Sequence, residues 1–349
     1  MRVLVVRLGA FGDILHTLPL AADLKAGGHE VDWLCEDRWS VLLTGSAALG
    51  QVHCLPRRLI RAPTPWPQRL AALSRCLREL REQRYEVVID AQGLAKSAFF
   101  AAGSAAPRRI GHAPPTAREG SWLVSRERVP TLRLHVIDQQ RDLARALGII
   151  PHGPPCFPLP HWFEADRWAA QQLTQLGLEQ PWMLNVGAGW PTKVWPATHQ
   201  VALARELGQQ QVPLLLMWGT PGEHAAAEAV RLHAGHGVVA PPTTIAQLGG
   251  LIRRSQLLIS GDTGPLHLAF ALGTPAVGLF GPVPALRNGP YGPGYESLQA
   301  PAAPWERSDM SKVEMGAIGV VQVLAAARRC LATAAGASTL PPAPGDGLA

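Results

Sequence analysis

The sequence predicts an α/β protein of two halves, each built on a parallel β-sheet covered by helices. Three observations lead to this prediction. Short apolar runs alternate with amphipathic helical patterns, glycine-containing loops follow the runs, and a proline-rich segment at 150–155 separates two stretches of similar size. Strand, loop and helix in repeated order are typical of parallel sheets, because parallel neighbours need a crossover connection.

The first half, residues 1–150, begins with a buried run that ends in the loop Gly9–Asp13, and a helical pattern follows that loop. A basic helix is expected at about 69–84. The predicted strands of this half are 3–6, 31–34 and 87–90.

The second half, residues 151–335, repeats the pattern, and a tail at 336–349, rich in Ala, Pro and Gly, is expected to be disordered. Ligands of such sheets bind outside the carboxyl ends of the strands. Two halves that face each other would therefore enclose a cleft. The predicted strands of this half are 182–186, 212–218, 256–260 and 276–280.

Composition narrows the class of protein. The 349 residues are 47% hydrophobic, which suits two folded domains rather than a disordered chain. Five cysteines without a CxxC pair argue against a disulfide framework or a zinc site. The net charge of +6 favours anionic partners without choosing among them. No signal peptide or membrane-spanning run is recognisable, so a cytoplasmic protein with possible peripheral membrane contact is expected.

The segment Gly261–Ala269 is the strongest functional candidate. It follows a predicted strand, and a helix should begin near Pro265, so its backbone N–H groups can bind an anion. Thr263 and Gly264 would let the backbone approach a phosphate, Asp262 could accept hydrogen bonds from sugar hydroxyls, and His267 would face the same pocket. The alternative is a helix cap beside a packed histidine, and these residues alone leave both readings open.

The segment Asp262–Pro282 closely resembles a motif of bacterial heptosyltransferases of glycosyltransferase family 9. Further segments resemble the family's enzyme for the first heptose, and the matches run in order from Arg2 to about Gly292. These segments are Gly12–Pro19, Val88–Ala98, Lys193–Pro196 and Gly219–Glu223.

The resemblance implies the GT-B fold, in which two Rossmann-like domains with parallel sheets face each other across a cleft. The first domain would bind the acceptor and the second the nucleotide sugar. It also implies an inverting transfer of heptose from ADP-heptose to the Kdo of the lipopolysaccharide inner core, without a metal or other cofactor. The absence of an Asp-x-Asp motif for Mg²⁺ agrees with this expectation.

The resemblance also suggests roles for residues. Asp13 is the candidate general base, with a helix N-cap as its alternative. Lys193 should bind the diphosphate, and Glu223, whose alternative is a first-turn helix residue, should bind the ribose. The remaining donor-site candidates are Thr192, Thr243, Asp262, Thr263, Gly264 and His267, and the acceptor-site candidates are Arg57, Arg58, Arg61, Gln92 and Lys96.

Two departures from the family pattern bear on the donor site. Val283 stands where the family usually has threonine, and Ala188–Thr192 lacks a Thr-Thr pair before Lys193. Phosphate contacts there would come from backbone amides or from Thr192.

Several alternatives stay open. The chain could use another acceptor or a later core position, act as a sugar-nucleotide epimerase, or bind a nucleotide sugar without catalysis. The expected partners are ADP-heptose and an anionic, lipid-linked acceptor of the Kdo-lipid A type, with peripheral contact to the inner membrane and no nucleic acid. The basic stretch around Arg57, Arg58 and Arg61 suits an anionic acceptor or lipid surface, or is a solvated charged face.

Overall fold

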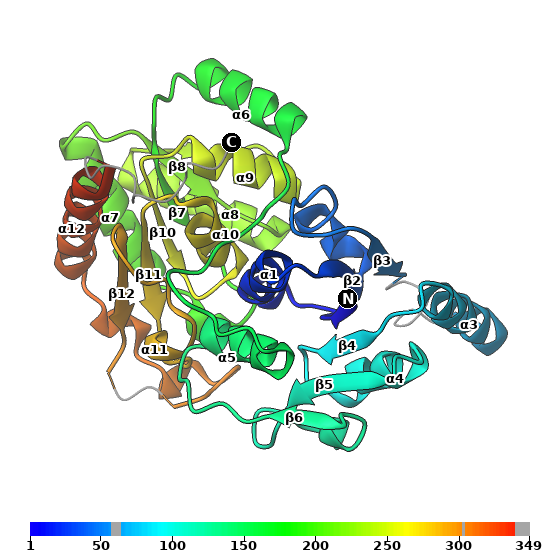
Figure 1. Cartoon of the computed structure of the whole chain (residues 1–349). Coiled ribbons are helices and arrows are strands. Elements are labelled where there is room, and N and C mark those ends of the chain that lie inside the picture. The colour runs from blue at the N-terminus through cyan, green and yellow to red at the C-terminus, as the bar shows by residue number, and fades with distance from the viewer. Residues whose placement is uncertain (57–63, 302–303, 339–349) are drawn as a thin grey trace. The chain divides into compact units, whose positions relative to one another are not determined.

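The computed structural model describes residues 1–56, 64–301 and 304–338. The chain divides into two compact units, Met1–His161 and Trp162–Ala349 (Figure 1). The sequence places the boundary at residue 150, whereas the units divide after the proline-rich segment. One reason is Arg141, whose guanidinium donates to the carbonyl oxygens of His152 and Gly153 and so holds that segment to the first unit.

The first unit contains a parallel sheet of six strands in the order β3-β2-β1-β4-β5-β6. Strand β1 lies in the middle and pairs with β2 on one side and β4 on the other, in the strand order of dinucleotide-binding folds. The strands are β1 (Arg2–Val6), β2 (Glu30–Glu36), β3 (Val52–Leu55), β4 (Val87–Asp90), β5 (Arg108–His112) and β6 (Glu127–Val129).

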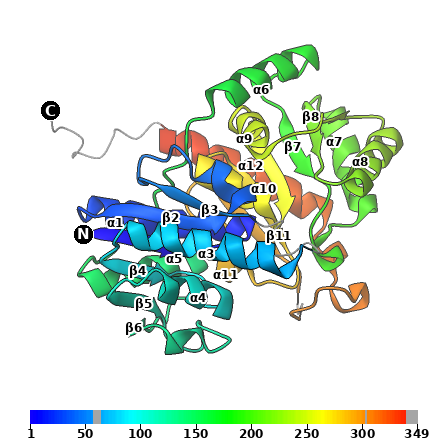
Figure 2. The ribbon, with the colours of Figure 1, turned by 90° about the vertical axis from the view of Figure 1, so that its right-hand side faces the viewer.

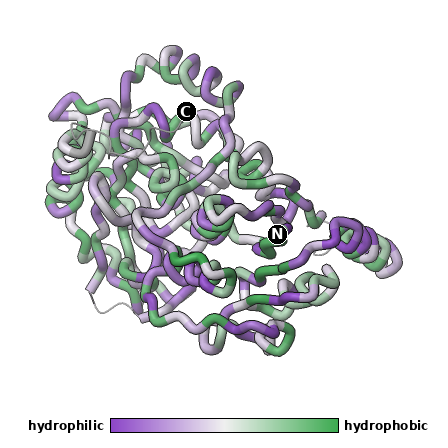
Figure 3. The backbone as a smooth tube through the Cα atoms, in the orientation of Figure 1, coloured by the Kyte–Doolittle hydropathy of each residue, from purple (hydrophilic) through white to green (hydrophobic). Residues whose placement is uncertain are grey.

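Helices cover both faces of this sheet. Helices α1 and α5 pack together on one face, and α3 and α4 pack on the other, where Cys76, Leu80 and Phe100 meet Leu4 and Val6 of β1. Helix α3 buries only Cys76 and Leu80, and Figure 3 shows hydrophilic residues along it. The helices are α1 (Phe11–Ala26), α3 (Trp66–Glu82), α4 (Ala95–Gly103) and α5 (Val136–Asp142), with 3₁₀ turns η1 (Asp37–Leu42), η2 (Ser121–Leu123) and η3 (Leu143–Leu147).

The second unit repeats this topology with six parallel strands in the order β12-β11-β10-β7-β8-β9. Read from β9, this order matches that of the first unit. The parallel α/β class predicted from the sequence is confirmed for both units. The strands are β7 (Trp182–Asn185), β8 (Leu214–Met217), β9 (Val238–Val239), β10 (Leu257–Gly261), β11 (Ala276–Phe280) and β12 (Tyr295–Gln299).

The core of the second unit lies between the sheet and helices α7, α8 and α12, which bury Leu203, Val230 and Val323 against it. Helices α9 and α10 pack together beside the sheet, α6 packs on α9, and Figure 2 separates this group from α7 and α8. The helices are α6 (Phe163–Gln175), α7 (Ala197–Gln209), α8 (Pro221–Ala234), α9 (Ile245–Arg253), α10 (Gly264–Leu272), α11 (Ala285–Asn288) and α12 (Val320–Ser338), with 3₁₀ turns η4 (Pro191–Lys193), η5 (Met310–Lys312) and η6 (Met315–Ala317).

Helix α12 continues to Ser338, so the first residues of the predicted tail belong to a helix, and residues 339–349 lie outside the described residues. Among the helices of the described ranges, none is both long and apolar enough to cross a membrane.

Candidate active site

The end of β10 delivers the strongest predicted segment to the edge of the second sheet. Gly261 is the last residue of the strand, Thr263 is the N-cap of α10, and the helix begins at Gly264. The Thr263 side chain makes no capping bond to the helix, and the N–H of Leu266 donates to the Thr263 carbonyl at 3.1 Å. A helix N-terminus of this kind favours an anion.

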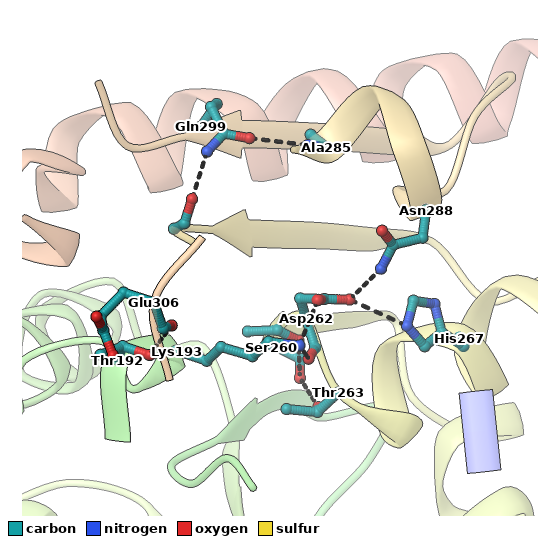
Figure 4. Close-up of polar contacts among 12 residues, drawn as sticks. Thr192, Lys193, Ser260, Asp262, Thr263, His267, Ala285, Asn288, Gln299 and Glu306 are labelled. Carbon is teal, nitrogen blue, oxygen red and sulfur yellow. Dashed lines mark hydrogen bonds and ion pairs between the residues drawn. The ribbon is translucent and has the colours of Figure 1, made fainter. Parts of the chain in front are cut away.

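Asp262 is the centre of a buried polar cluster (Figure 4). The residue is 5% exposed. Its Oδ2 pairs with Lys193 Nζ at 2.5 Å, and its Oδ1 accepts from Asn288 Nδ2 at 2.6 Å and lies 3.2 Å from His267 Nε2. A buried charge is tolerated only when it is paired and hydrogen-bonded, and Asp262 meets both conditions.

The pKa of Asp262 reflects two opposing effects. Burial alone would raise the pKa of this carboxyl group. The hydrogen bond and charge of His267, together with the charge and hydrogen bond of Lys193, outweigh burial and hold the pKa below its usual value. The carboxylate therefore stays ionised at neutral pH and can accept hydrogen bonds from a ligand.

Lys193 lies at the end of η4, and three contacts fix its ammonium group. Nζ donates to the carboxylate of Asp262 and, at 3.1 Å, to its main-chain oxygen, and it lies 4.5 Å from the centre of the Trp190 ring. A Cβ added to Gly261 would come within 2.8 Å of the Lys193 carbonyl oxygen, so η4 packs directly on the end of β10. The cation therefore lies beside the loop that leads into α10.

Hydroxyl groups tie this loop to the neighbouring strand β7. Asn185 Nδ2, at the end of β7, donates to Ser260 Oγ and to Thr263 Oγ1, both at 3.1 Å. The two hydroxyl oxygens lie 2.9 Å apart. The Thr192 hydroxyl, fully buried, donates instead to the carbonyl of Glu306 at 2.8 Å.

Glu223 occupies the first turn of α8, after β8. Its Oε2 accepts from the backbone N–H of Gly219 at 2.8 Å. The carboxylate lies directly against Gly187, where any Cβ would overlap it. Because β7 and β8 are neighbours in the sheet, Glu223 joins the loops that follow both strands.

The loop before α9 contains the last donor-site candidate. Thr243 lies there, half-buried. The adjacent Thr244 is the N-cap of α9, because its hydroxyl accepts from the backbone N–H of Gln247.

In the first unit, Asp13 lies in the first turn of α1 and is half exposed. Its Oδ1 is 3.0 Å from Arg7 Nη2, and its Oδ2 accepts from the backbone N–H of Ala10 at 3.1 Å. Arg7 is itself anchored, because Nη1 donates to the carbonyl of Ala91 at 2.5 Å. Asp13 is thus not the N-cap residue itself, although it binds the N-cap backbone, and one guanidinium holds it at the carboxyl end of β1.

The acceptor-site candidates are placed in part. Gln92 Oε1 accepts from the backbone N–H of Leu8 at 2.9 Å, which ties the loop after β4 to the loop after β1. Lys96 Nζ lies 3.8 Å from Glu36 Oε1, at the end of β2. Gln92 and Lys96 therefore lie at the same edge of the sheet as Asp13. Arg57, Arg58 and Arg61 lie outside the described residues.

Sequence reasoning missed two residues that bind site side chains. Asn288 is 7% exposed and holds Asp262, and Arg7 holds Asp13. A polar residue inside the otherwise apolar run at 3–8 was the available signal for Arg7. The sequence held no such signal for Asn288, because its partner Asp262 lies 26 residues away in the chain. Within the described ranges, no three His, Cys, Asp or Glu residues gather in a way that could hold a metal ion.

Comparisons with known proteins agree on one family. The model of glycosyltransferase family 9 (heptosyltransferase) matches residues 73–314. Lipopolysaccharide heptosyltransferase 1 of Pseudomonas aeruginosa is 29% identical over 304 residues, and the match covers 84% of this chain and 82% of that protein. The Escherichia coli protein of the same name is 28% identical over 309 residues, and the match covers 86% of this chain and 94% of that protein. The solved structure of E. coli heptosyltransferase WaaC with ADP-2-deoxy-2-fluoro heptose superposes with a TM-score of 0.74 at 26% identity, covering 93% of this chain and 98% of that one.

Proposed function

Because this chain belongs to glycosyltransferase family 9, the heptosyltransferases, we propose that it transfers heptose from ADP-heptose to the Kdo of the lipopolysaccharide inner core. The relatives named heptosyltransferase 1 support the acceptor, and the WaaC structure with an ADP-heptose analogue supports the donor. The loops of the second unit supply the chemistry that this donor needs.

The observation that carries the proposal is the Lys193–Asp262 pair beside the N-terminus of α10. A diphosphate gains negative charge as its bond to the sugar breaks. Lys193 and the N–H groups of Thr263 and Gly264 stabilise that charge more strongly in the transition state than in the ground state. Asp262, held ionised, accepts hydrogen bonds from heptose hydroxyls, and His267 keeps its carboxylate in position.

The reaction is a single displacement with inversion at the anomeric carbon. The acceptor hydroxyl gives its proton to the Asp13 carboxylate as its oxygen attacks. The new carbon–oxygen bond forms while the bond to the diphosphate breaks, and ADP leaves with the electron pair. Arg7 keeps Asp13 in place for this step. Such general base catalysis contributes about 100- to 10,000-fold.

The rest of the donor binds along the loops after β7 and β8. Glu223 accepts hydrogen bonds from the two ribose hydroxyls, which suit a carboxylate acceptor. Thr243 lies on the adenine side, and Thr192 supports the phosphate loop through its bond to Glu306.

The acceptor binds through the first unit. Lys96 and Gln92, together with Arg57, Arg58 and Arg61, recognise the carboxylates and phosphates of a Kdo-lipid A acceptor. The same basic residues hold the protein peripherally at the cytoplasmic face of the inner membrane, at about 1 kcal/mol for each basic residue near an anionic surface.

A transfer assay with ADP-heptose and a panel of acceptors tests the proposal. Kdo-lipid A should gain one heptose by mass analysis, and a core that already carries the first heptose should react far more slowly. A preference for that later acceptor would move the enzyme to another step of core assembly. Turnover of the donor without any acceptor would instead favour a sugar-nucleotide epimerase.

A further inference from the structure

Two tryptophans and two arginines form a rim beside the donor site of the second unit, and all of them except the half-buried Trp190 are exposed. Trp190 and Trp305 meet edge to face, with ring centres 5.5 Å apart. Arg307 lies over Trp190 at 4.5 Å, and Arg287 lies over Trp305 at 5.9 Å. We call these four residues the cationic rim.

The cationic rim is connected to Asp262 through two of the partners of that carboxylate. Asp262 pairs with Lys193, and Lys193 lies on Trp190. On the other side Asp262 binds Asn288, the neighbour in sequence of Arg287. The rim therefore begins where the donor-binding side chains end. Lys193 Nζ and the guanidinium carbon of Arg307 each lie 4.5 Å from the centre of the Trp190 ring. The two charges are therefore separated by no more than twice that distance.

The charges of the rim are not neutralised within the part of the chain that the structure describes. Lys193 has Asp262 as its counterion, but neither Arg287 nor Arg307 lies within ion-pair distance of a carboxylate there. The acidic side chains next to Arg307 are engaged elsewhere. Glu306 accepts from the backbone N–H groups of residues 307, 308 and 309, and both it and Asp309 pair with Lys312.

Several hydrogen bonds hold the loop that contains Arg307. The same hydrogen bonds hold the pKa of Glu306 at about 2, so its carboxylate stays charged and keeps the turn closed. The buried hydroxyl of Thr192 ties the loop to η4 through the Glu306 carbonyl. Cation–π contacts place both guanidinium groups over tryptophan rings, and both arginines are exposed. This restraint lowers the entropic cost of binding an anion.

We propose that Arg287 and Arg307 form an anion site that binds an acidic group of the sugar acceptor, either a carboxylate of an acidic sugar or a phosphate of a glycolipid. The inference rests on the proposed function, because it assigns the rim to the acceptor of that reaction. The donor diphosphate already has Lys193 and the N-terminus of α10, whereas Arg287 stands beyond Trp305. Guanidinium groups match carboxylates and phosphates in a bidentate manner.

The test compares Arg287→Gln, Arg307→Gln and the double variant with wild type. Arg328→Gln is the matched control, since Arg328 is an exposed arginine of the same unit that contacts Gln210. Each rim substitution should raise the KM for Kdo-lipid A about tenfold, and the double variant about a hundredfold, in line with charge-assisted hydrogen bonds. The Kd for ADP should stay within about twofold of wild type. Added salt should weaken acceptor binding more in wild type than in the double variant.

Two acceptors separate the sources of the anion. An equal loss with a dephosphorylated, deacylated Kdo acceptor would assign the rim to the sugar carboxylate, and a loss confined to phosphorylated Kdo-lipid A would assign it to the phosphate. An acceptor KM equal to that of Arg328→Gln, or an equal loss of ADP affinity, would overturn the proposal. Equilibrium binding of a labelled Kdo acceptor tests the anion site independently of heptose transfer. If wild type binds this acceptor more tightly than the rim variants do but transfers no heptose, the proposed function is wrong and the anion site is supported.

Discussion

Replacing Asp262 with asparagine removes one charge from the centre of the donor site and changes almost no volume. The carboxylate has three partners, and one of them, Lys193, is a cation whose side chain is only 14% exposed. Asparagine would leave that ammonium without a counterion, and its amide would place donor hydrogens against the donors of Asn288 or Lys193. We therefore expect Asp262→Asn to destabilise the second unit.

The size of the effect follows from the burial of the pair. Removing one partner of a buried ion pair costs about 3–5 kcal/mol. Lys193 keeps a main-chain acceptor, the Trp190 ring and some contact with solvent, so we expect a cost at or just below the lower limit of that range, about 2–3 kcal/mol. With a urea dependence of about 2 kcal/mol per molar, the unfolding midpoint should fall by about 1–1.5 M.

The difference should depend on pH in one direction. The pKa of Asp262 is lower in the folded protein than the usual value of about 3.9. Its charge therefore stabilises the fold fully above that value, and the contribution is lost as the pH falls through the folded-state pKa. Wild type and Asp262→Asn should differ by a constant amount between about pH 7 and 5 and should converge in acid.

Urea unfolding followed by circular dichroism across this pH range measures the effect. Asp166→Asn is the control, because Asp166 pairs with Arg253 and Arg254 at a more exposed position of the same unit and should cost at most about 1 kcal/mol. A variant as stable as wild type at pH 7, or a difference that grows in acid, would refute the assignment of Asp262 as a buried, charged anchor.

Three further predictions concern other residues of the two units. Lys193→Gln should weaken ADP binding about 10- to 100-fold by calorimetry, because a charge-assisted contact to the diphosphate is lost, and a Kd within twofold of wild type would contradict that role. Gly187→Ala should displace the Glu223 carboxylate and weaken ADP binding about tenfold, whereas Gly189→Ala, whose Cβ meets only open space, should bind like wild type; equal affinities for both would argue against Glu223 as a ribose ligand. The hydrogen bond from Cys35 lowers the pKa of Cys54 to about 6, so the rate of Cys54 alkylation should reach half its maximum near pH 6. This alkylation phase should be absent in Cys54→Ser. A midpoint near pH 8.5, about the usual pKa of a free thiol, would contradict the prediction.

The sequence predicted the class of fold because the central strands of both sheets are buried on both faces. Such strands appear as continuous apolar runs, and β1, β4, β10 and β11 were located this way. The outer strands went unpredicted because they are short or half exposed. Strand β9 has only two residues, and β12 mixes polar and apolar side chains, most of them half-buried.

The candidate site was predictable where a motif holds neighbouring residues together. The end of β10 is followed closely by Asp262, Thr263 and His267, the last of which lies in the first turn of α10. Their proximity could therefore be predicted from the sequence. The contact of Asn288 with Asp262 and that of Trp305 with Trp190 could not be predicted, because loops of irregular length, which no sequence period describes, bring these residues together. The roles of these residues in binding and catalysis remain predictions.

The most direct test of the account measures heptose transfer and ADP binding together for Asp13→Asn. In the proposed reaction, the Asp13 carboxylate of the first unit is the base, and the second unit binds the donor. Glu119→Gln is the control, since Glu119 also accepts from a backbone N–H, that of Ala95, in the same unit. Asp13→Asn should lose about 100- to 10,000-fold in transfer rate while it binds ADP like wild type and Glu119→Gln stays active. An Asp13→Asn enzyme that transfers heptose at the wild-type rate would contradict the account.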